Sequence, residues 1–300
     1  MLSTAIILPG DTELFPFNSF RTIDGVEWDG IFFSGKRQHP SFDRSLIYSS
    51  PEIIPLICDL LIVVDPQFCT FEYLSFAIRN GCHLFLADKL CLTSEERKQL
   101  FLLANEGDTY IRIQNDLLFH PFQEKIRIAS PQTAFTEVSQ PLPISRELTD
   151  QLLNENLLMI LRAVGSKVQE VDVFCGILPL GESPVITIPL NFKSGSVVTL
   201  KLKFSEPEAR HVLSIHSGAE ITVYDFGQNT INYISENGIN TSEQGVSFNP
   251  LADQIAEFVR NITEKNYPGI NQSEEMTLFL LMEKIRQKIE NQLNYNRLVS

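Results

Sequence analysis

Two titratable side chains stand at positions where they could take part in acid–base chemistry. His120 precedes Pro121 at the end of a predicted strand, close to the edge at which α/β sheets bind ligands. Imidazole titrates near neutral pH without large tuning, so His120 is a candidate acid or base, with a structural cap at a domain junction as its alternative role. Glu155 lies on a predicted helix and becomes a candidate base if burial raises its pKa, although a solvated helix carboxylate is the commoner case.

The loop after the first predicted strand decides whether a dinucleotide can bind. A dinucleotide-binding fold needs glycines there, because the backbone must turn tightly and approach the pyrophosphate. The sequence "AIILPGDTELFPF" offers only Gly10, which is followed by the acidic residues Asp11 and Glu13. We therefore expect an ordinary turn, and binding of NAD or NADP is doubtful on this ground.

The histidines and cysteines lack the spacing of a metal site. His211 and His216 are five residues apart in a predicted strand, which places them on opposite faces of the sheet. The five cysteines form no C-x-x-C pair and are scattered along the chain at Cys58, Cys69, Cys82, Cys91 and Cys175. This distribution favours reduced thiols over disulfides or a zinc site, and we predict no metal.

Length and composition indicate a folded protein with two domains. The chain has 300 residues, of which 43% are apolar and 20% charged. Its formal net charge of -13 leaves no basic surface for nucleic acid or for anionic membranes. No apolar run approaches the roughly 20 residues that span a bilayer, and the N-terminus "MLSTAIILPG" lacks a signal-peptide pattern. We expect a cytoplasmic protein.

Residues 1–121 alternate strand and helix patterns. The third predicted strand, 60–64, is continuously apolar and ends at Asp65 and Pro66, which is typical of a strand buried on both faces of a parallel sheet. The other strands are expected at 5–8, 31–33, 84–86 and 110–113, with helices at 70–80 and 93–107. We predict a Rossmann-like doubly wound parallel sheet for residues 1–121.

Residues 122–300 have a different pattern, which predicts an α+β domain with a large, mostly antiparallel sheet. The three prolines between 131 and 144 indicate a linker or an irregular crossing, and a helix is expected at 148–164. Six strand patterns then follow one another between 168 and 234 without intervening helices. Two helices close the chain, the first with Asn249 as its N-cap and Pro250 at its first helical position.

The segment "DPQFCTFEYLSFAIRNGCHLFLADKLCLT", residues 65–93, resembles a segment of the Gfo/Idh/MocA family that runs from a T-P-P turn to an E-K-P motif. The segments "YIRIQNDLLFHPF" and "PLADQIAEFVRNITEKNYPG" are also similar to that family. The resemblance implies an α/β fold with an N-terminal NAD(P)-binding domain, and often a dimer built on the C-terminal sheet. It places Gly10, Asp65, Pro66 and Asp88 at cofactor-binding positions.

The chain departs from the family pattern at the residues that the family uses for chemistry. A gapless alignment puts Asp88 at the position of the family lysine, and Lys89 follows one residue later. The predicted helix at 148–164 has Glu155 or Asn154 where the family has a histidine, depending on the register. Leu118 stands at the position of a family arginine.

These departures favour a relative without the family's hydride-transfer activity, which binds a small metabolite as a homodimer through its C-terminal sheet. The alternative is an active NAD(P)-dependent dehydrogenase of a sugar-like or small hydroxylated substrate, with Lys89 or Glu155 acting together with His120. A purely structural or interaction module is a third hypothesis. Neither nucleic acid nor membrane is an expected partner under any of them.

Overall fold

Two units, each with its own β-sheet, make up the chain in the computed structural model. The first unit comprises Met1–Asn115 and Asn249–Thr277, and the second comprises Asp116–Phe248 and Leu278–Ser300. The structure describes residues 1–9, 22–35, 47–87, 92, 94–177, 184–218, 220–235, 240–246, 249–265 and 272–299. The predicted α/β class, with a parallel sheet first and a mostly antiparallel sheet second, is confirmed.

The sheet of the first unit is parallel throughout its described strands. Their order in space is β2-β1-β3-β4-β5. The strands are β1 (Leu2–Leu8), β2 (Val26–Phe33), β3 (Leu60–Val63), β4 (His83–Leu86) and β5 (Ile111–Ile113). All four residues of β3 are buried, as the continuous apolar run predicts for a strand covered on both faces. A single parallel bridge from Ile31 to Ile47 extends the pairing on the outer side of β2.

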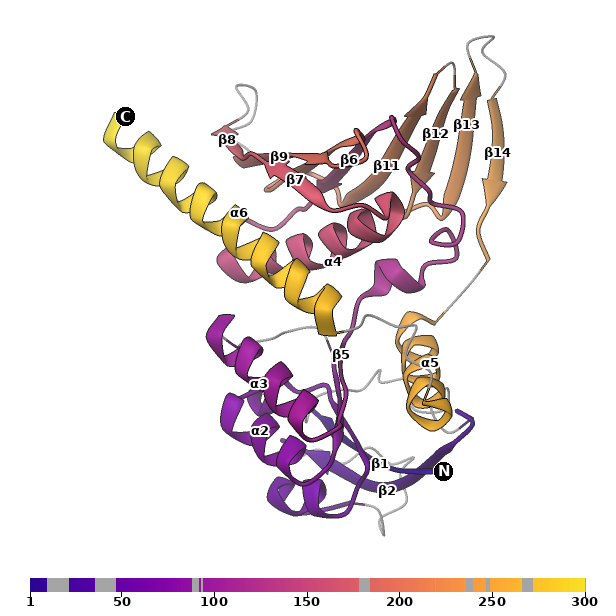
Figure 1. Cartoon of the computed structure of the whole chain (residues 1–300), viewed down its shortest axis with the longest axis vertical. Helices are drawn as coiled ribbons and strands as arrows, with labels where there is room; N and C mark the ends of the chain where they lie inside the picture. The colour runs from indigo at the N-terminus through magenta and orange to yellow at the C-terminus, as the bar shows by residue number, and fades with distance from the viewer. Residues whose placement is uncertain are drawn as a thin grey trace. The chain divides into compact units, whose positions relative to one another are not determined.

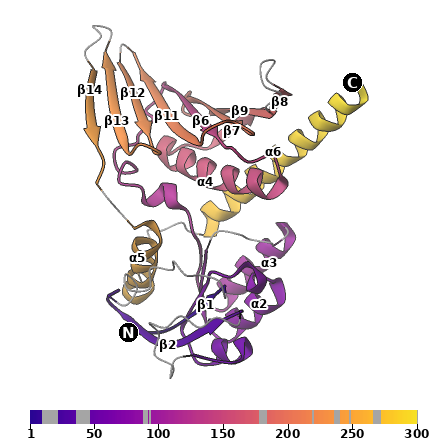
Figure 2. The same cartoon turned by 180° about the vertical axis from the view of Figure 1, so that it is seen from behind.

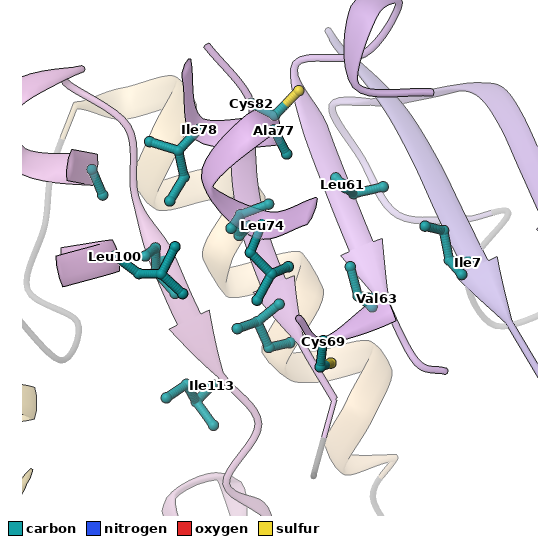
Figure 3. Packing of buried hydrophobic residues seen from close by; sticks show 14 of the residues in the cluster. Ile7, Leu61, Val63, Cys69, Leu74, Ala77, Ile78, Cys82, Leu100 and Ile113 are labelled. Carbon is teal, nitrogen blue, oxygen red and sulfur yellow. The ribbon is translucent and has the colours of Figure 1, made fainter. Parts of the chain in front are cut away.

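The helices α2 (Phe71–Arg79) and α3 (Ser94–Glu106) cover one face of this sheet (Figure 1). Thr70 caps α2 as predicted, because its hydroxyl oxygen accepts a hydrogen bond from the Tyr73 backbone N–H at 3.4 Å. The buried cluster between helices and strands includes Leu61, Val63, Leu74, Ala77, Ile78 and Leu100 (Figure 3). The predicted start of α3, at 93, lies outside the described residues.

The opposite face is covered by α5 (Pro250–Glu264), which comes from the far end of the chain (Figure 1). The Asn249 side chain accepts a hydrogen bond from the Ala252 backbone N–H at 3.4 Å, which confirms Asn249 as the predicted N-cap. The helix buries Ile255, Phe258, Val259 and Ile262 against Ile6, Leu8, Ile31, Leu60, Ile62 and Phe85. The first unit therefore includes 249–277, whereas the prediction divided the chain into 1–121 and 122–300.

The second unit contains a large mixed sheet, in which the described strands have the order β14-β13-β12-β11-β6-β10-β9-β7, with β8 also paired to β9. Figure 2 shows β14, β13, β12 and β11 side by side. The strands are β6 (Thr133–Ser139), β7 (Val168–Val171), β8 (Phe174–Ile177), β9 (Pro184–Phe192), β10 (Val197–Lys203), β11 (Arg210–Ser217), β12 (Glu220–Asp225), β13 (Thr230–Ser235) and β14 (Asn240–Gln244). The described pairs are antiparallel except for β6 with β10.

The prediction of a linker between 131 and 144 is wrong, because β6 lies inside this segment and in the middle of the sheet. Its prolines flank the strand and are absent from it: Pro131 precedes β6, and Pro141 and Pro143 follow it. Every residue from 133 to 139 can therefore donate to a neighbouring strand, and the sheet tolerates the segment at its centre.

The second unit contains α4 (Arg146–Val164) and, from Leu278 onward, α6 (Gln272–Val299). The Arg286 side chain of α6 contacts Asp150 of α4, with 2.5 Å between Nε and Oδ1. Further along α6, Gln292 donates to the Val173 carbonyl at 2.6 Å and accepts from the Cys175 backbone N–H at 2.8 Å. Although α6 is long, neither it nor another helix in the described ranges is apolar enough over a membrane-spanning length. Two short 3-10 helices, η2 (Pro51–Leu56) and η4 (Asp116–Phe119), complete the connections that follow β2 and β5.

Candidate functional site

The carboxyl edge of the first unit's sheet contains a topological switch point between β1 and β3. The chain moves from β1 to β2 on one side and then returns to β3 on the other side of β1. Open α/β sheets bind their ligands at such points, outside the carboxyl ends of the two strands. The backbone N–H groups of Val64 and Asp65 both donate to the Ile7 carbonyl, at 2.9 and 3.3 Å, so Asp65 is fixed beside the end of β1.

Asp65 has one carboxylate oxygen that no described residue satisfies. The residue is only 2% exposed. Its Oδ1 atom accepts from the Gln67 backbone N–H at 2.9 Å and so caps the 3-10 helix η3 (Pro66–Phe68). Its Oδ2 atom is buried and has no hydrogen-bond partner among the described residues. A buried acceptor without a donor costs about 1–3 kcal/mol, so this atom is suited to a ligand that brings a hydroxyl or an amide N–H.

A second buried polar contact joins the same edge of the sheet to α5. The side chain of Gln254 is fully buried, and its Oε1 atom accepts from the Asn115 backbone N–H at 2.7 Å. Asn115 follows β5 and is itself buried. Sequence reasoning missed Gln254, since a glutamine on a helix is usually solvated and its partner lies 139 positions away.

The structure brings two of the four predicted cofactor-binding residues to the switch point. Asp65 and Pro66 are adjacent there, the first as N-cap of η3 and the second at its first position. Gly10 and Asp88 lie outside the described residues, as does the candidate catalytic residue Lys89. The 65–66 turn therefore lies at the carboxyl edge of the sheet, and Gly10, Asp88 and Lys89 are not described.

Glu155 lies in the second unit, on α4, and has a polar neighbour one turn earlier. The Gln151 side chain donates to its Oε1 atom at 3.1 Å. Glu155 is half-buried. Asp150, on the same helix, is held by Arg286 in the ion pair described above, which gives it a structural role.

His120 is buried in the second unit and is held as a neutral ring. Burial lowers its pKa to about 4. Its Nδ1 atom accepts from the Phe122 backbone N–H at 3.3 Å, so the neutral ring carries its proton on Nε2. The ring also packs on Phe122 and, edge-on, on Phe226 at centroid distances of 4.4 and 5.1 Å. His120 therefore has the structural role that the sequence suggested as the alternative, and the one N–H group of its neutral ring is at Nε2.

Sequence reasoning missed that His211 belongs to the same cluster. Its ring centroid lies 4.7 Å from that of Phe226. Burial is the main cause that lowers the pKa of His211 to about 4, and the neighbouring His120 is the second. The Nε2 atom of His211 is buried and has no hydrogen-bond partner among the described residues. His216 packs instead edge-on against Phe135, so the two histidines lie on opposite faces of β11 as their spacing predicts.

The described part of the chain contains no group of three side chains that could hold a metal ion. Its cysteines, Cys58, Cys69, Cys82 and Cys175, form no disulfide. Cys58 and Cys82 are buried with their sulfur atoms 3.9 Å apart, and this contact together with burial raises the pKa of the Cys58 thiol. Such thiols are poor nucleophiles, which assigns this pair a packing role. Cys91 lies outside the described residues.

No family model and no curated protein sequence matches the chain. Solved structures do match it over nearly its whole length. A UDP-N-acetylglucosamine 3-dehydrogenase, GnnA from Acidithiobacillus ferrooxidans, is 17% identical, with a TM-score of 0.76 and coverage of 96% of this chain and 97% of that one. A dehydrogenase from Chromobacterium violaceum is 13% identical, with a TM-score of 0.78 and coverage of 100% of both chains.

A third match is the biliverdin reductase of Synechocystis, whose structure contains biliverdin and NADP+. It is 15% identical, with a TM-score of 0.74 and coverage of 95% of this chain and 98% of that one. At these identities the likeness establishes the fold alone. The resemblance read from the sequence is confirmed at that level, and the chain has the two-unit α/β fold of the Gfo/Idh/MocA-type dehydrogenases and oxidoreductases.

Proposed function

We propose that the chain is an oxidoreductase-type protein that binds a nicotinamide dinucleotide at the carboxyl edge of its parallel sheet. The observation that carries the proposal is the buried, unpartnered Oδ2 atom of Asp65 at the switch point between β1 and β3. A ribose hydroxyl or a carboxamide N–H is the kind of donor that this acceptor lacks. The shared fold supports the proposal, since one matching structure was solved with NADP+.

The residues named in this proposal would have the following roles. When bound, a nicotinamide dinucleotide supplies hydride-transfer chemistry. Asp65 would orient the ligand through Oδ2, while its Oδ1 remains bonded to Gln67. If the chain turns over a sugar-like or small hydroxylated substrate, the sequence offers Lys89 or Glu155 as the candidate base, and the Glu155 carboxylate is hydrogen-bonded to Gln151.

A second candidate function is binding without hydride transfer, in a protein that holds a small metabolite. The observation that favours it is the polar pair Gln151 and Glu155 on α4. One register of the alignment puts this pair at the positions of the family aspartate and histidine, and the other puts Asn154 at the histidine position. An imidazole titrates near neutral pH without large tuning, and the α4 pair contains none. Binding of the cofactor and turnover of a substrate are therefore separate questions.

The binding proposal is tested by titrating the purified protein with NADH and NADPH and following nicotinamide fluorescence. The matched variants are Asp65→Asn and Asp59→Asn, at opposite ends of β3. Asp65→Asn keeps an oxygen for Gln67 but puts an amide N–H where Oδ2 stands, so we expect affinity to fall about 10- to 100-fold. Asp59 is exposed and accepts from the Ser3 backbone N–H at 3.1 Å, so its variant should stay within about twofold.

Absence of binding to either nucleotide, or an equal loss of affinity in both variants, would refute the proposed site. Turnover then separates the two candidate functions. A panel of sugars and small hydroxy acids, assayed with the nucleotide that binds, should give a rate that Glu155→Gln lowers if the chain is a dehydrogenase. Tight binding with no turnover on any member would favour a protein that binds without hydride transfer.

A further inference from the structure

β7 and β8 form one edge of the large sheet, because both pair with the same side of β9. Val171 is paired with Leu190 and Phe174 with Thr187, so the two short strands act as one interrupted edge strand. Among the described strands, none pairs with the outer side of β7 or β8. Such an edge exposes a row of backbone N–H and C=O groups to which a further strand can bind, and native proteins protect these groups.

The helix α6 lies beside this edge and occupies its free hydrogen-bonding groups (Figure 1, Figure 2). Gln292 donates from Nε2 to the Val173 carbonyl at 2.6 Å, and its Oε1 atom accepts from the Cys175 backbone N–H at 2.8 Å. In a parallel sheet, one residue bonds in the same manner to the C=O and the N–H of residues two apart on the neighbouring strand. The Gln292 carboxamide therefore takes the place of one residue of a parallel strand, opposite Phe174.

Gln292 stands at an apolar position of α6. Ile285 and Ile289 are buried one turn apart, and Gln292 follows Ile289 by three residues on the same side of the helix. One turn before Gln292, Lys288 donates to the Asp172 Oδ1 atom at 2.7 Å. The side chains of Lys288 and Asp172 are 37% and 49% exposed, so water and other donors reach this second contact. The end of α6 is thus attached to the edge by polar contacts with which a strand can compete.

We propose that α6 closes this edge to strand pairing, and that a second copy of the chain pairs with the edge when the contacts of Lys288 and Gln292 are lost. The segment 173–177 reads VFCGI, which has no charged residue and contains β-branched and aromatic side chains typical of strands. A strand supplies from its backbone the same donor and acceptor as the Gln292 carboxamide. The pairing involves the second unit alone and is independent of the proposed dinucleotide site.

A twofold axis through Cys175 makes this segment its own partner. Antiparallel pairing about that axis places Val173 opposite Ile177 and lets Cys175 of the two copies exchange backbone hydrogen bonds. Asp172 lies outside 173–177, so the acidic side chains of the two copies do not face each other. Charge therefore does not oppose a second copy at the position that Gln292 otherwise fills.

The test uses the full chain with Lys288→Ala and Gln292→Ala together, which removes both contacts and leaves the buried isoleucines of α6 in place. At low protein concentration, amide hydrogen exchange at 173–177 should be at least about tenfold faster than in the wild type. At high concentration, light scattering coupled to size exclusion should give at least twice the mass of the wild type. Lys284→Ala with Gln287→Ala, two exposed changes on the same helix, should leave the exchange rate and the mass unchanged.

A second measurement checks which residues meet in the associated form. Cys175 is half-buried, whereas Cys58, Cys69 and Cys82 are buried. In chains that also carry Cys91→Ser, a short bismaleimide should therefore join Cys175 of two copies of the double variant. The wild type should give little of this product, and Cys175→Ser added to the double variant should abolish it.

Faster exchange at 173–177 with an unchanged mass would overturn the pairing, since the edge would then be open and still unpaired. Unchanged exchange would overturn the protective role of α6. Crosslinking that persists with Cys175→Ser would place the contact elsewhere and overturn the twofold axis. If circular dichroism shows that the double variant has lost helix, Gln292→Glu, which keeps an acceptor and loses the donor, takes its place in the same measurements with the same outcomes.

Discussion

The two buried histidines are the side chains whose charge state the fold controls most directly. His120 and His211 both contact Phe226, and both have a pKa of about 4 because they are buried. A histidine in an unfolded chain has a pKa of about 6.5. Both rings are consequently neutral in the folded protein at neutral pH. The Nε2 atom of His211 has no hydrogen-bond partner among the described residues, so no described acceptor would stabilise a proton on it.

This environment predicts a loss of stability on mild acidification. Below about pH 6.5 the unfolded chain takes up protons on these histidines, whereas the folded protein resists protonation until about pH 4. The free energy of unfolding should therefore fall as the pH falls between these values, by about 2 kcal/mol for each histidine at pH 5. Urea unfolding at pH 7.5, 6.5, 5.5 and 5.0 measures this dependence.

The matched variants for this prediction lie on opposite faces of β11. His211→Phe keeps a flat ring against Phe226 and removes the titrating group, so the stability lost between pH 6.5 and 5 should shrink by about half. His216→Phe, next to Phe135, should leave the dependence unchanged. A wild type whose free energy of unfolding is the same at pH 7.5 and 5 would contradict the assigned burial.

At the residue scale, the sequence predicted where a residue lies in the fold better than which atoms it contacts. The 65–66 turn was found because a continuous apolar run ends there, which marks the carboxyl end of a buried strand. The unpartnered Oδ2 atom of Asp65 could not be predicted, since it depends on backbone bonds to Ile7 in another strand. His211 was missed for a similar reason, because Phe226 and His120 meet it only after β11 and β12 pair.

At the scale of elements, local signals predicted what forms but not what it packs against. The N-cap Asn249, Pro250 and the apolar stripe predicted α5, and the structure confirms the helix. A stripe shows that one face is buried, and nothing in its spacing shows that the partner is a sheet formed more than 160 residues earlier. The error at β6 was local, since prolines at both ends of a short strand resemble the composition of a loop.

The contact between α5 and the end of β5 makes a prediction about one glutamine. Gln254→Leu removes the acceptor of the buried Asn115 N–H and leaves that donor unsatisfied, so the free energy of unfolding should fall by about 1–3 kcal/mol. Gln287→Leu, an exposed change on α6, should alter it by less than about 0.5 kcal/mol. Urea unfolding of both variants at pH 7.5 gives the two changes in the free energy of unfolding. Equal changes would show that the buried hydrogen bond of Gln254 does not stabilise the protein more than the exposed Gln287 side chain does.

At the scale of the whole molecule, the outer face of the large sheet carries exposed apolar side chains. Phe135 is 49% exposed, Phe174 58% and Ile234 37%. The strand pairings place all three on the same face, which we call the outer sheet face. Exposed apolar side chains on one face of a sheet are typical of sites where a monomer associates, and a twofold dimer buries the same face from both copies.

We therefore predict a homodimer that forms through the outer sheet face. Light scattering coupled to size exclusion should give twice the mass of one chain for the wild type. Phe135→Asp puts a charge at the middle of the face, next to β11, and should shift the protein to a single chain at low micromolar concentration. Leu280→Asp, on α6 and 57% exposed, should leave the mass unchanged. A wild type with the mass of one chain would contradict this assembly.

The discontinuous first unit also affects how the protein is made. During synthesis, β1 to β5 leave the ribosome long before α5, and at about 5–20 residues per second the interval from Ile113 to Ile262 is roughly 7 to 30 seconds. Throughout that time the sheet face formed by Ile6, Leu60 and Phe85 lacks the helix that covers it. The nascent chain therefore has to be kept from aggregating until its last quarter is translated, which makes it a natural client for a chaperone that binds apolar surface.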